Sequence, residues 1–133
     1  MATFRRFQSA VPNRRGTYPG VVALATGLAS SGRLTAADAA WLRRANDNAN
    51  ATYPNPTAAT PDCYDRALNP GARSWFRDSA EHLFVLTDPY LELLDRYEVP
   101  WVELRTSSPG RIVHEDDVQV VAIPWAHVDH WLP

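Results

Sequence analysis

The sequence contains no lysine, only one cysteine and no long apolar run. Because Cys63 has no second cysteine to pair with, an internal disulfide is excluded, and nothing in the chain requires an oxidising compartment. The apolar run at residues 21–29 is far shorter than the ~20 residues that cross a bilayer, so we expect no membrane partner. These absences favour a cytoplasmic protein.

Reaction motifs are absent as well. The sequence has no glycine-rich phosphate loop, serine elbow, paired-cysteine metal knuckle or histidine-glutamate metalloprotease signature. No motif therefore identifies a reaction, the question of enzyme activity stays open, and we expect no cofactor.

The start of the chain superficially resembles a twin-arginine export signal, because Arg5, Arg6 and Phe7 precede the apolar run. Pro12 and Pro19 interrupt the passage from basic to apolar residues, so we expect no export. Arginine without lysine, together with many alanines, is typical of a GC-rich genome and favours a bacterial source.

The charges that are present are distributed unevenly. Residues 1–77 hold ten arginines and four aspartates (10 − 4 = +6), and residues 78–133 hold three arginines and eleven acids (3 − 11 = −8), which gives the net charge of −2. Either the two parts neutralise each other inside one fold, or each presents its charge to an outside partner. We favour internal neutralisation.

A chain of 133 residues with 45% hydrophobic and 11% aromatic residues has the size and composition of one compact domain over residues 1–133. Within it, residues 1–17 are expected to form a strand or arm, residues 54–69 a proline-rich loop and residues 124–133 a tail.

Two helices are predicted in the first half. Residues 21–28 form a short apolar helix that ends at Gly32. Residues 36–51 form a second helix, in which Thr35 caps the first turn and the Asp38 carboxylate reaches back to the cap.

Two further helices are predicted to begin at Asn69-Pro70 and Asp88-Pro89, because each pair combines a cap with a first-turn proline. The third helix has apolar and small residues at helical spacing, namely Ala72, Trp75, Phe76, Ser79, Ala80 and Leu83.

After Pro100 the hydrophobic period changes to two, which predicts a β-meander over residues 101–105, 111–115 and 118–123. The apolar last strand is expected to be central, with residues 3–10 as one possible neighbour. The predicted fold class is α+β, with four helices packed on a small, mostly antiparallel three- to four-stranded sheet formed mainly by this meander.

A cluster of one imidazole and three carboxyls lies at the predicted hairpin tip, His114 to Asp117. If Asp116 and Asp117 form a two-residue loop, His114 faces Gln119, and a structural hydrogen bond between these two explains the histidine. The alternative is acid-base chemistry, for which the best candidates are His82, His114 and Asp116.

Segment 111–122 resembles the opening strands of the histidine-triad nucleotide-binding family in its apolar residues around Glu115, Asp116 and Asp117. The family's alternating histidine motif is missing from this chain, because His127 and His130 stand without a third histidine. The resemblance therefore implies no nucleotidyl activity here.

The C-terminal tail offers weak metal-ligand candidates in His127, Asp129 and His130, whose spacing could place three ligands around one ion. We favour a tail that docks without metal through Trp125 and Trp131.

The densest basic patch contains Arg5, Arg6, Arg14 and Arg15, in a stretch with no acid before Asp38. Guanidinium groups beside aromatic residues can hold phosphate or a base, although a pI near 6.0 is low for a nucleic-acid domain. The alternative is pairing with acids of the second half.

Three functions follow from these observations. The first is a small non-catalytic accessory or regulatory protein that acts by protein-protein interaction or self-association, through the basic arginines and the tail tryptophans. The second is a small enzyme with an acid-base site near His82 or His114 and neighbouring carboxylates. The third is nucleic-acid or nucleotide binding through the arginine-rich N-terminal region.

Overall fold

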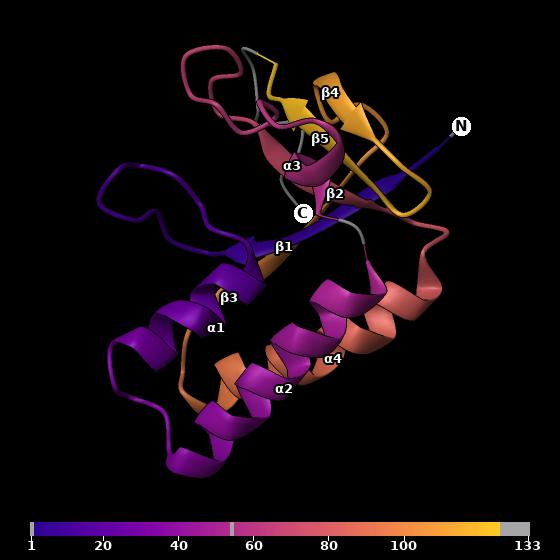
Figure 1. Ribbon diagram of the computed structural model, residues 1–133. Coiled ribbons are helices and arrows are strands. Elements are labelled where there is room, and N and C mark those ends of the chain that lie inside the picture. The colour runs from indigo at the N-terminus through magenta and orange to yellow at the C-terminus, as the bar shows by residue number, and fades with distance from the viewer. Residues whose placement is uncertain (1, 54, 126–133) are drawn as a thin grey trace. The chain divides into compact units, whose positions relative to one another are not determined.

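The computed structural model describes residues 2–53 and 55–125 and is an α+β structure (Figure 1). Its described residues divide into two compact units. Unit 1 comprises residues 2–6, 55–84 and 103–125, and unit 2 comprises residues 7–53 and 85–102. The expectation of one domain stays a prediction.

Five strands form one sheet in the order β3-β1-β2-β5-β4. They are β1 (Phe4–Ser9), β2 (Arg73–Arg77), β3 (Trp101–Thr106), β4 (Arg111–Glu115) and β5 (Gln119–Ile123). The pairings β1–β2, β2–β5 and β4–β5 are antiparallel. Strand β5 has a neighbour on each side and four buried residues, as its apolar sequence predicts.

The predicted arrangement of four helices on a three- to four-stranded meander is wrong. The described structure has three long helices, α1 (Val21–Ser30), α2 (Ala36–Thr52) and α4 (Glu81–Arg96), the single-turn α3 (Pro56–Ala59), and a five-stranded sheet. The three C-terminal strands form no meander, because β3 and β4 occupy opposite ends of the strand order and β5 takes β2 rather than residues 3–10 as its second neighbour.

The error began at the predicted third helix, where Arg73–Arg77 is strand β2. Trp75 and Phe76 fit the apolar stripe of a helix, but aromatic residues also favour strands, and Trp75 is fully buried between pairings with β1 and β5. Nor does a new helix begin at Asp88, since α4 runs through Pro89 without a break.

The β4–β5 hairpin has a different register from the predicted one. His114 pairs with Val121 and Glu115 with Val120, and a bulge lies between Ile112 and His114. The turn is displaced by one residue, because Asp116 N–H still donates to the Gln119 carbonyl (2.9 Å). The Asp116 carboxylate accepts from the N–H groups that follow it, which makes Asp116 the residue before the turn instead of one within it.

In unit 2, helix α2 and residues 85–96 of helix α4 run side by side (Figure 1). Trp41 meets Tyr90 edge to face at 5.4 Å between ring centroids, and the Tyr90 hydroxyl donates to Asn46 (2.7 Å). Leu93 and Leu94 of α4 are fully buried. The amphipathic pattern of both helices thus becomes a packed interface.

The predicted cap of α2 is half right. Thr35 accepts a hydrogen bond from Asp38 N–H (3.1 Å), as expected of a cap residue. The Thr35 N–H donates not to the Asp38 carboxylate, as predicted, but to the Tyr97 hydroxyl (3.0 Å), which in turn donates to Asp38 (2.7 Å). The hydrogen bond from the Tyr97 hydroxyl lowers the pKa of Asp38. Burial opposes this shift, and the positive charge of Arg96 adds to it.

The proline-rich segment is tightly wound over residues 55–69. Asn55 caps α3, Asp65 accepts from two backbone N–H groups that follow it, and Asn69 donates to the Asp62 carbonyl (2.7 Å). Cys63 is fully buried within this segment. No helix in the part of the chain that the structure describes is long and apolar enough to cross a membrane.

Candidate functional site

The segment between β1 and α1, residues 10–19, is here named the arginine loop (Figure 1). It closes like a hairpin: Ser9 N–H donates to the Pro19 carbonyl (2.8 Å), and Asn13 N–H donates to the Thr17 carbonyl (2.8 Å). At the tip, Gly16 N–H donates to the Asn13 carbonyl (3.0 Å), which closes a four-residue turn. The loop therefore has a defined backbone.

Asn13 organises the tip. Its side-chain oxygen accepts from the backbone N–H of Arg15 and from both the N–H and the hydroxyl of Thr17, each at 3.0 Å. Gly16 follows with φ of 77°, a conformation that side chains other than glycine rarely adopt. Asparagine, two corner residues and glycine are the expected chemistry of such a turn, and the two corners are Arg14 and Arg15.

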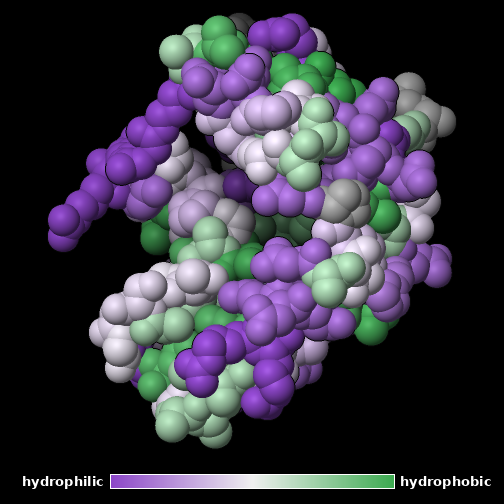
Figure 2. Space-filling model, viewed as in Figure 1, coloured by the Kyte–Doolittle hydropathy of each residue, from purple (hydrophilic) through white to green (hydrophobic). Residues whose placement is uncertain are grey.

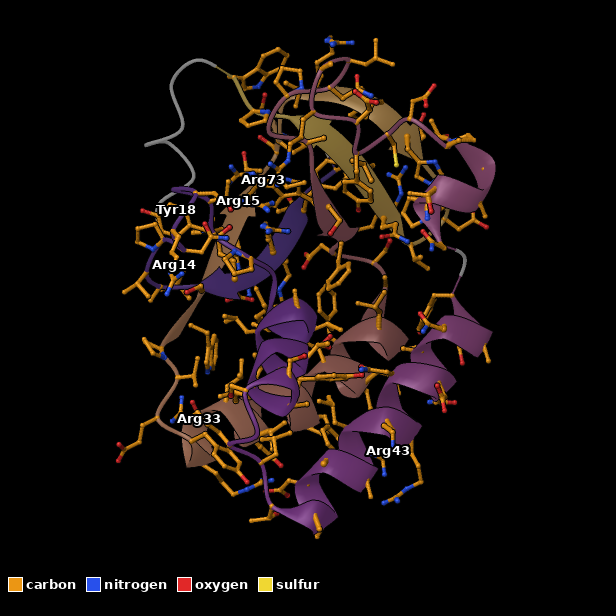
Figure 3. The ribbon with its side chains drawn as sticks, turned by 60° about the vertical axis from the view of Figure 1, so that its left-hand side comes forward. Arg14, Arg15, Tyr18, Arg33, Arg43 and Arg73 are labelled. Atoms are coloured by element: carbon orange, nitrogen blue, oxygen red, sulfur yellow. The ribbon has the colours of Figure 1, made fainter. Side chains whose placement is uncertain are left out.

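Arg14 and Arg15 are exposed and pair with no carboxylate among residues 2–53 and 55–125. Figure 2 shows hydrophilic side chains projecting from the molecule where Figure 1 shows this loop. In Figure 3, Arg14, Arg15 and Tyr18 gather on the loop, whereas Arg33 and Arg43 lie away from it on the helical part of unit 2. Val11, 54% exposed, and Tyr18, 36% exposed, add apolar surface to the loop.

The other two predicted binding arginines are used by the fold. Arg5 donates to Glu103 (2.6 Å), and its guanidinium lies 4.0 Å from the centroid of the Phe84 ring. Asp78 is a further acidic neighbour at 3.9 Å. The prediction that these arginines pair with acids of the second half is confirmed for Arg5, but not for the loop arginines.

Arg6 is buried on β1, and its guanidinium donates to the Ser74 carbonyl (2.9 Å). Burial, followed by the nearby positive charge of Arg73, lowers the pKa of Arg6 to about 10. Its charge is retained at neutral pH, and the buried guanidinium is bonded within unit 1.

A second cluster lies in unit 1, where Thr60, His114 and Asp116 form a hydrogen-bonded array. Thr60 Oγ1 is 2.9 Å from His114 Nδ1, and His114 Nε2 is 3.2 Å from Asp116 Oδ2. His114 and Asp116 are two residues apart on an extended segment, so their side chains lie on the same face. Thr60 follows the last residue of α3 in a non-helical conformation, as expected of a residue that precedes a proline, here Pro61.

Asp116 is held firmly at the end of this array. Burial opposes its ionisation, but hydrogen bonds from the N–H groups of Val118 and Gln119 (each 2.9 Å), with a further contribution from His114, lower the pKa of Asp116 overall. The carboxylate is therefore charged at neutral pH. The predicted hydrogen bond between His114 and Gln119 gives way to the bonds with Thr60 and Asp116.

Sequence reasoning placed His114 and Asp116 among the catalytic candidates but missed Thr60. Thr60 is 54 residues away in the chain, and only the packing of α3 beside the hairpin joins them. The one local signal was the pair Thr60-Pro61, which marks a helix end. His82 is exposed in the first turn of α4 and is not a member of the array.

The remaining predicted residues divide into two groups. Trp125 is 45% exposed and donates from its indole nitrogen to Ser108 Oγ (2.8 Å). Trp131, His127, Asp129 and His130 lie outside the described residues. Within residues 2–53 and 55–125, no group of three histidine, cysteine or acidic side chains could hold a metal ion.

A surface hollow of about 340 Å³ in unit 1 contains none of the predicted catalytic residues. Its lining residues are Ala2, Thr3, Arg77, Asp78 and Ser79. Arg77, one of these lining residues, donates hydrogen bonds to the Glu115 carboxylate (3.0 Å) and to the Asp116 carbonyl (2.8 Å). Through Arg77, the hollow adjoins the turn that holds Asp116.

Comparison with known protein families, curated proteins and solved structures finds no match to this chain. The two sites are accordingly interpreted from their own geometry.

Proposed function

We propose that this chain is an accessory or regulatory protein that acts by protein-protein interaction, and that its arginine loop binds an acidic surface of the partner. The observation that carries the proposal is the placement of Arg14 and Arg15 at the two corners of an ordered, exposed turn, with no carboxylate partner among the described residues. Four hydrogen bonds at the tip, three of them to the Asn13 side chain, order this turn before any partner arrives.

Order at the tip matters because association costs free energy for each side chain and loop that it immobilises. A backbone that is already fixed leaves only the arginine side chains to be ordered. Each guanidinium can then bond a carboxylate with two parallel N–H groups. Tyr18 and Val11 supply adjoining exposed apolar surface, and tyrosine and arginine are the residue types that most often dominate binding energy at interfaces.

A protein partner is favoured over nucleic acid by how few of the arginines remain available. The pI of about 6.0 also lies below the basic range that is typical of nucleic-acid-binding domains. Of the four arginines proposed for nucleic-acid contact, Arg5 and Arg6 are occupied within unit 1. Two arginines on one loop suit a local carboxylate cluster better than an extended polyanion.

The proposal includes a cytoplasmic location in a bacterium. It is supported by the single buried Cys63 and by an arginine-only basic composition.

The direct test is an NMR titration of the isotopically labelled full chain with a short glutamate-rich peptide, and in parallel with a thymidine oligonucleotide of matched charge. We expect the peptide to shift the amide signals of the arginine loop. The double variant R14A/R15A should weaken peptide binding about tenfold, the effect of two exposed ion pairs.

The matched control is R43A/R44A, which removes the same charge from two adjacent exposed arginines on α2 of the same unit. It should leave peptide binding nearly unchanged. Equal losses in both double variants would show non-specific attraction and would refute the proposal. Tighter binding of the oligonucleotide, lost in R14A/R15A, would make the partner a nucleic acid instead.

A further inference from the structure

The array in unit 1 joins a hydroxyl, an imidazole and a carboxylate in series. The distances are 2.9 Å from Thr60 Oγ1 to His114 Nδ1 and 3.2 Å from His114 Nε2 to Asp116 Oδ2. A nucleophile within hydrogen-bond reach of a base, with the base oriented by a third group, is the arrangement that activates hydroxyl nucleophiles. It lies in the unit without the arginine loop, so it stands independently of the proposed binding function.

The fixed carboxylate decides where the protons are. Asp116 is ionised at neutral pH and can only accept, so a neutral His114 must carry its proton on Nε2. His114 Nδ1 is then an acceptor, and the Thr60 hydroxyl must donate to it. The hydroxyl proton therefore already points at the base that would remove it.

The thiol of Cys63, a competing nucleophile near Thr60, is suppressed. Cys63, whose N–H donates to the Thr60 carbonyl (3.0 Å), is fully buried. Burial, and to a lesser extent the negative charge of Asp62, raises the pKa of its thiol. Thr60 itself is half-buried, and the Asp116 side chain is 19% exposed. Thr60 is therefore more accessible to solvent than the thiol.

We propose that Thr60 is an acyl-accepting nucleophile that transfers the acyl group of small esters to water, with His114 as its base and Asp116 as a positioning residue. Thr60 Oγ1 forms a bond to the ester carbonyl carbon while its proton moves to His114 Nδ1. The ester carbon–oxygen bond breaks, and the leaving alcohol takes that proton. Water then attacks the threonine ester by the same route, which releases the carboxylic acid and restores Thr60.

The test treats the full chain with p-nitrophenyl acetate and locates the acetyl group by peptide mass mapping. We expect acetylation at Thr60, retained in T60S and lost in T60V. H114N should slow it about 100-fold, the usual contribution of a general base. Control variant T57V removes a hydroxyl of the same segment that donates to Asn55 (2.8 Å), and it should leave the rate unchanged.

The role of Asp116 is tested by its effect on the imidazole. The nitrogen chemical shifts of His114 should show the proton on Nε2 in the native chain, and D116N should shift it towards Nδ1 and slow acetylation at least tenfold. D117N, which removes the neighbouring exposed charge, should change neither. Folding of each variant is checked by circular dichroism.

Two results would overturn the proposal. One is a folded native chain that releases p-nitrophenol no faster than T60V, or that acquires its acetyl group at another residue. The other is acetylation at Thr60 that proceeds at the native rate in folded H114N. The array would then only hold α3 against the hairpin.

Discussion

At the residue scale, identical side chains in one stretch of sequence have different roles because their backbone settings differ. Arg5 and Arg6 are adjacent on strand β1, so their side chains point to opposite faces and reach different partners, Glu103 and the Ser74 carbonyl. Arg14 and Arg15 occupy turn corners, where both are exposed. The sequence shows four equivalent arginines, and the structure separates them into two kinds.

This division predicts unequal effects on stability. R5A should lower the free energy of unfolding by about 1–2 kcal/mol, because it removes the bond to Glu103 and the contact with the Phe84 ring. R14A should change it by less than about 0.5 kcal/mol, as expected at an exposed position. Urea unfolding followed by tryptophan fluorescence measures both, and equal effects would contradict the division.

At the scale of the element, sequence patterns predicted helices correctly where residues that start or end a helix were present. They failed where a short segment fitted both the helical and the strand period. Helices α1 and α2 lie where glycine and threonine signals predict them. The prediction of a helix at strand β2 was wrong because a segment of five residues around Trp75 is too short to distinguish helical from strand periodicity. The segment is a strand because it pairs with β1 on one side and β5 on the other. The hairpin register was missed because the Asp116 side chain, not loop length alone, sets the turn.

The β4–β5 turn also predicts how stability depends on pH. The pKa of Asp116 is lowered in the folded state, so its contribution is fully present above its unfolded pKa of about 3.9 and is lost as the pH falls through the lower folded value. Native protein should therefore lose more stability than D116N between about pH 5 and pH 3. Asparagine still accepts from the two N–H groups but does not titrate.

The control for this turn is D117N, which removes an exposed charge one residue away. It should retain the native dependence on acid, measured as the urea midpoint at each pH. Parallel curves for the native chain and D116N would contradict the role given to Asp116.

At the scale of the whole molecule, charges from the two halves of the sequence meet within each unit. In unit 1, Arg5 and Arg77 pair with Glu103 and Glu115, and in unit 2, Asp38 pairs with Arg96 (3.0 Å). These pairs support internal neutralisation for part of the charge. The loop arginines are the exception, which is why they carry the proposed function.

The two units are expected to unfold together, because β1 and β3 each contribute residues to both. Leu94 is fully buried in unit 2, and L94A should destabilise the chain by about 2–5 kcal/mol through the cavity it leaves. Amide hydrogen exchange should then accelerate in β5 of unit 1 as well as in α4. Acceleration restricted to unit 2 would argue against one cooperative domain.

Local chemistry in the sequence alone predicted the α+β class, the first two helices and the three C-terminal strands as strands. The helices depend on residues a few positions apart, such as Thr35 with Asp38, whereas the turn that displays Arg14 and Arg15 is seen only in the structure. The tertiary structure decided the strand order, the burial of Arg6 and the union of Thr60 with His114. Those contacts join residues 54 or more positions apart, and their formation depends on which surfaces lose water together, a property that no local pattern encodes.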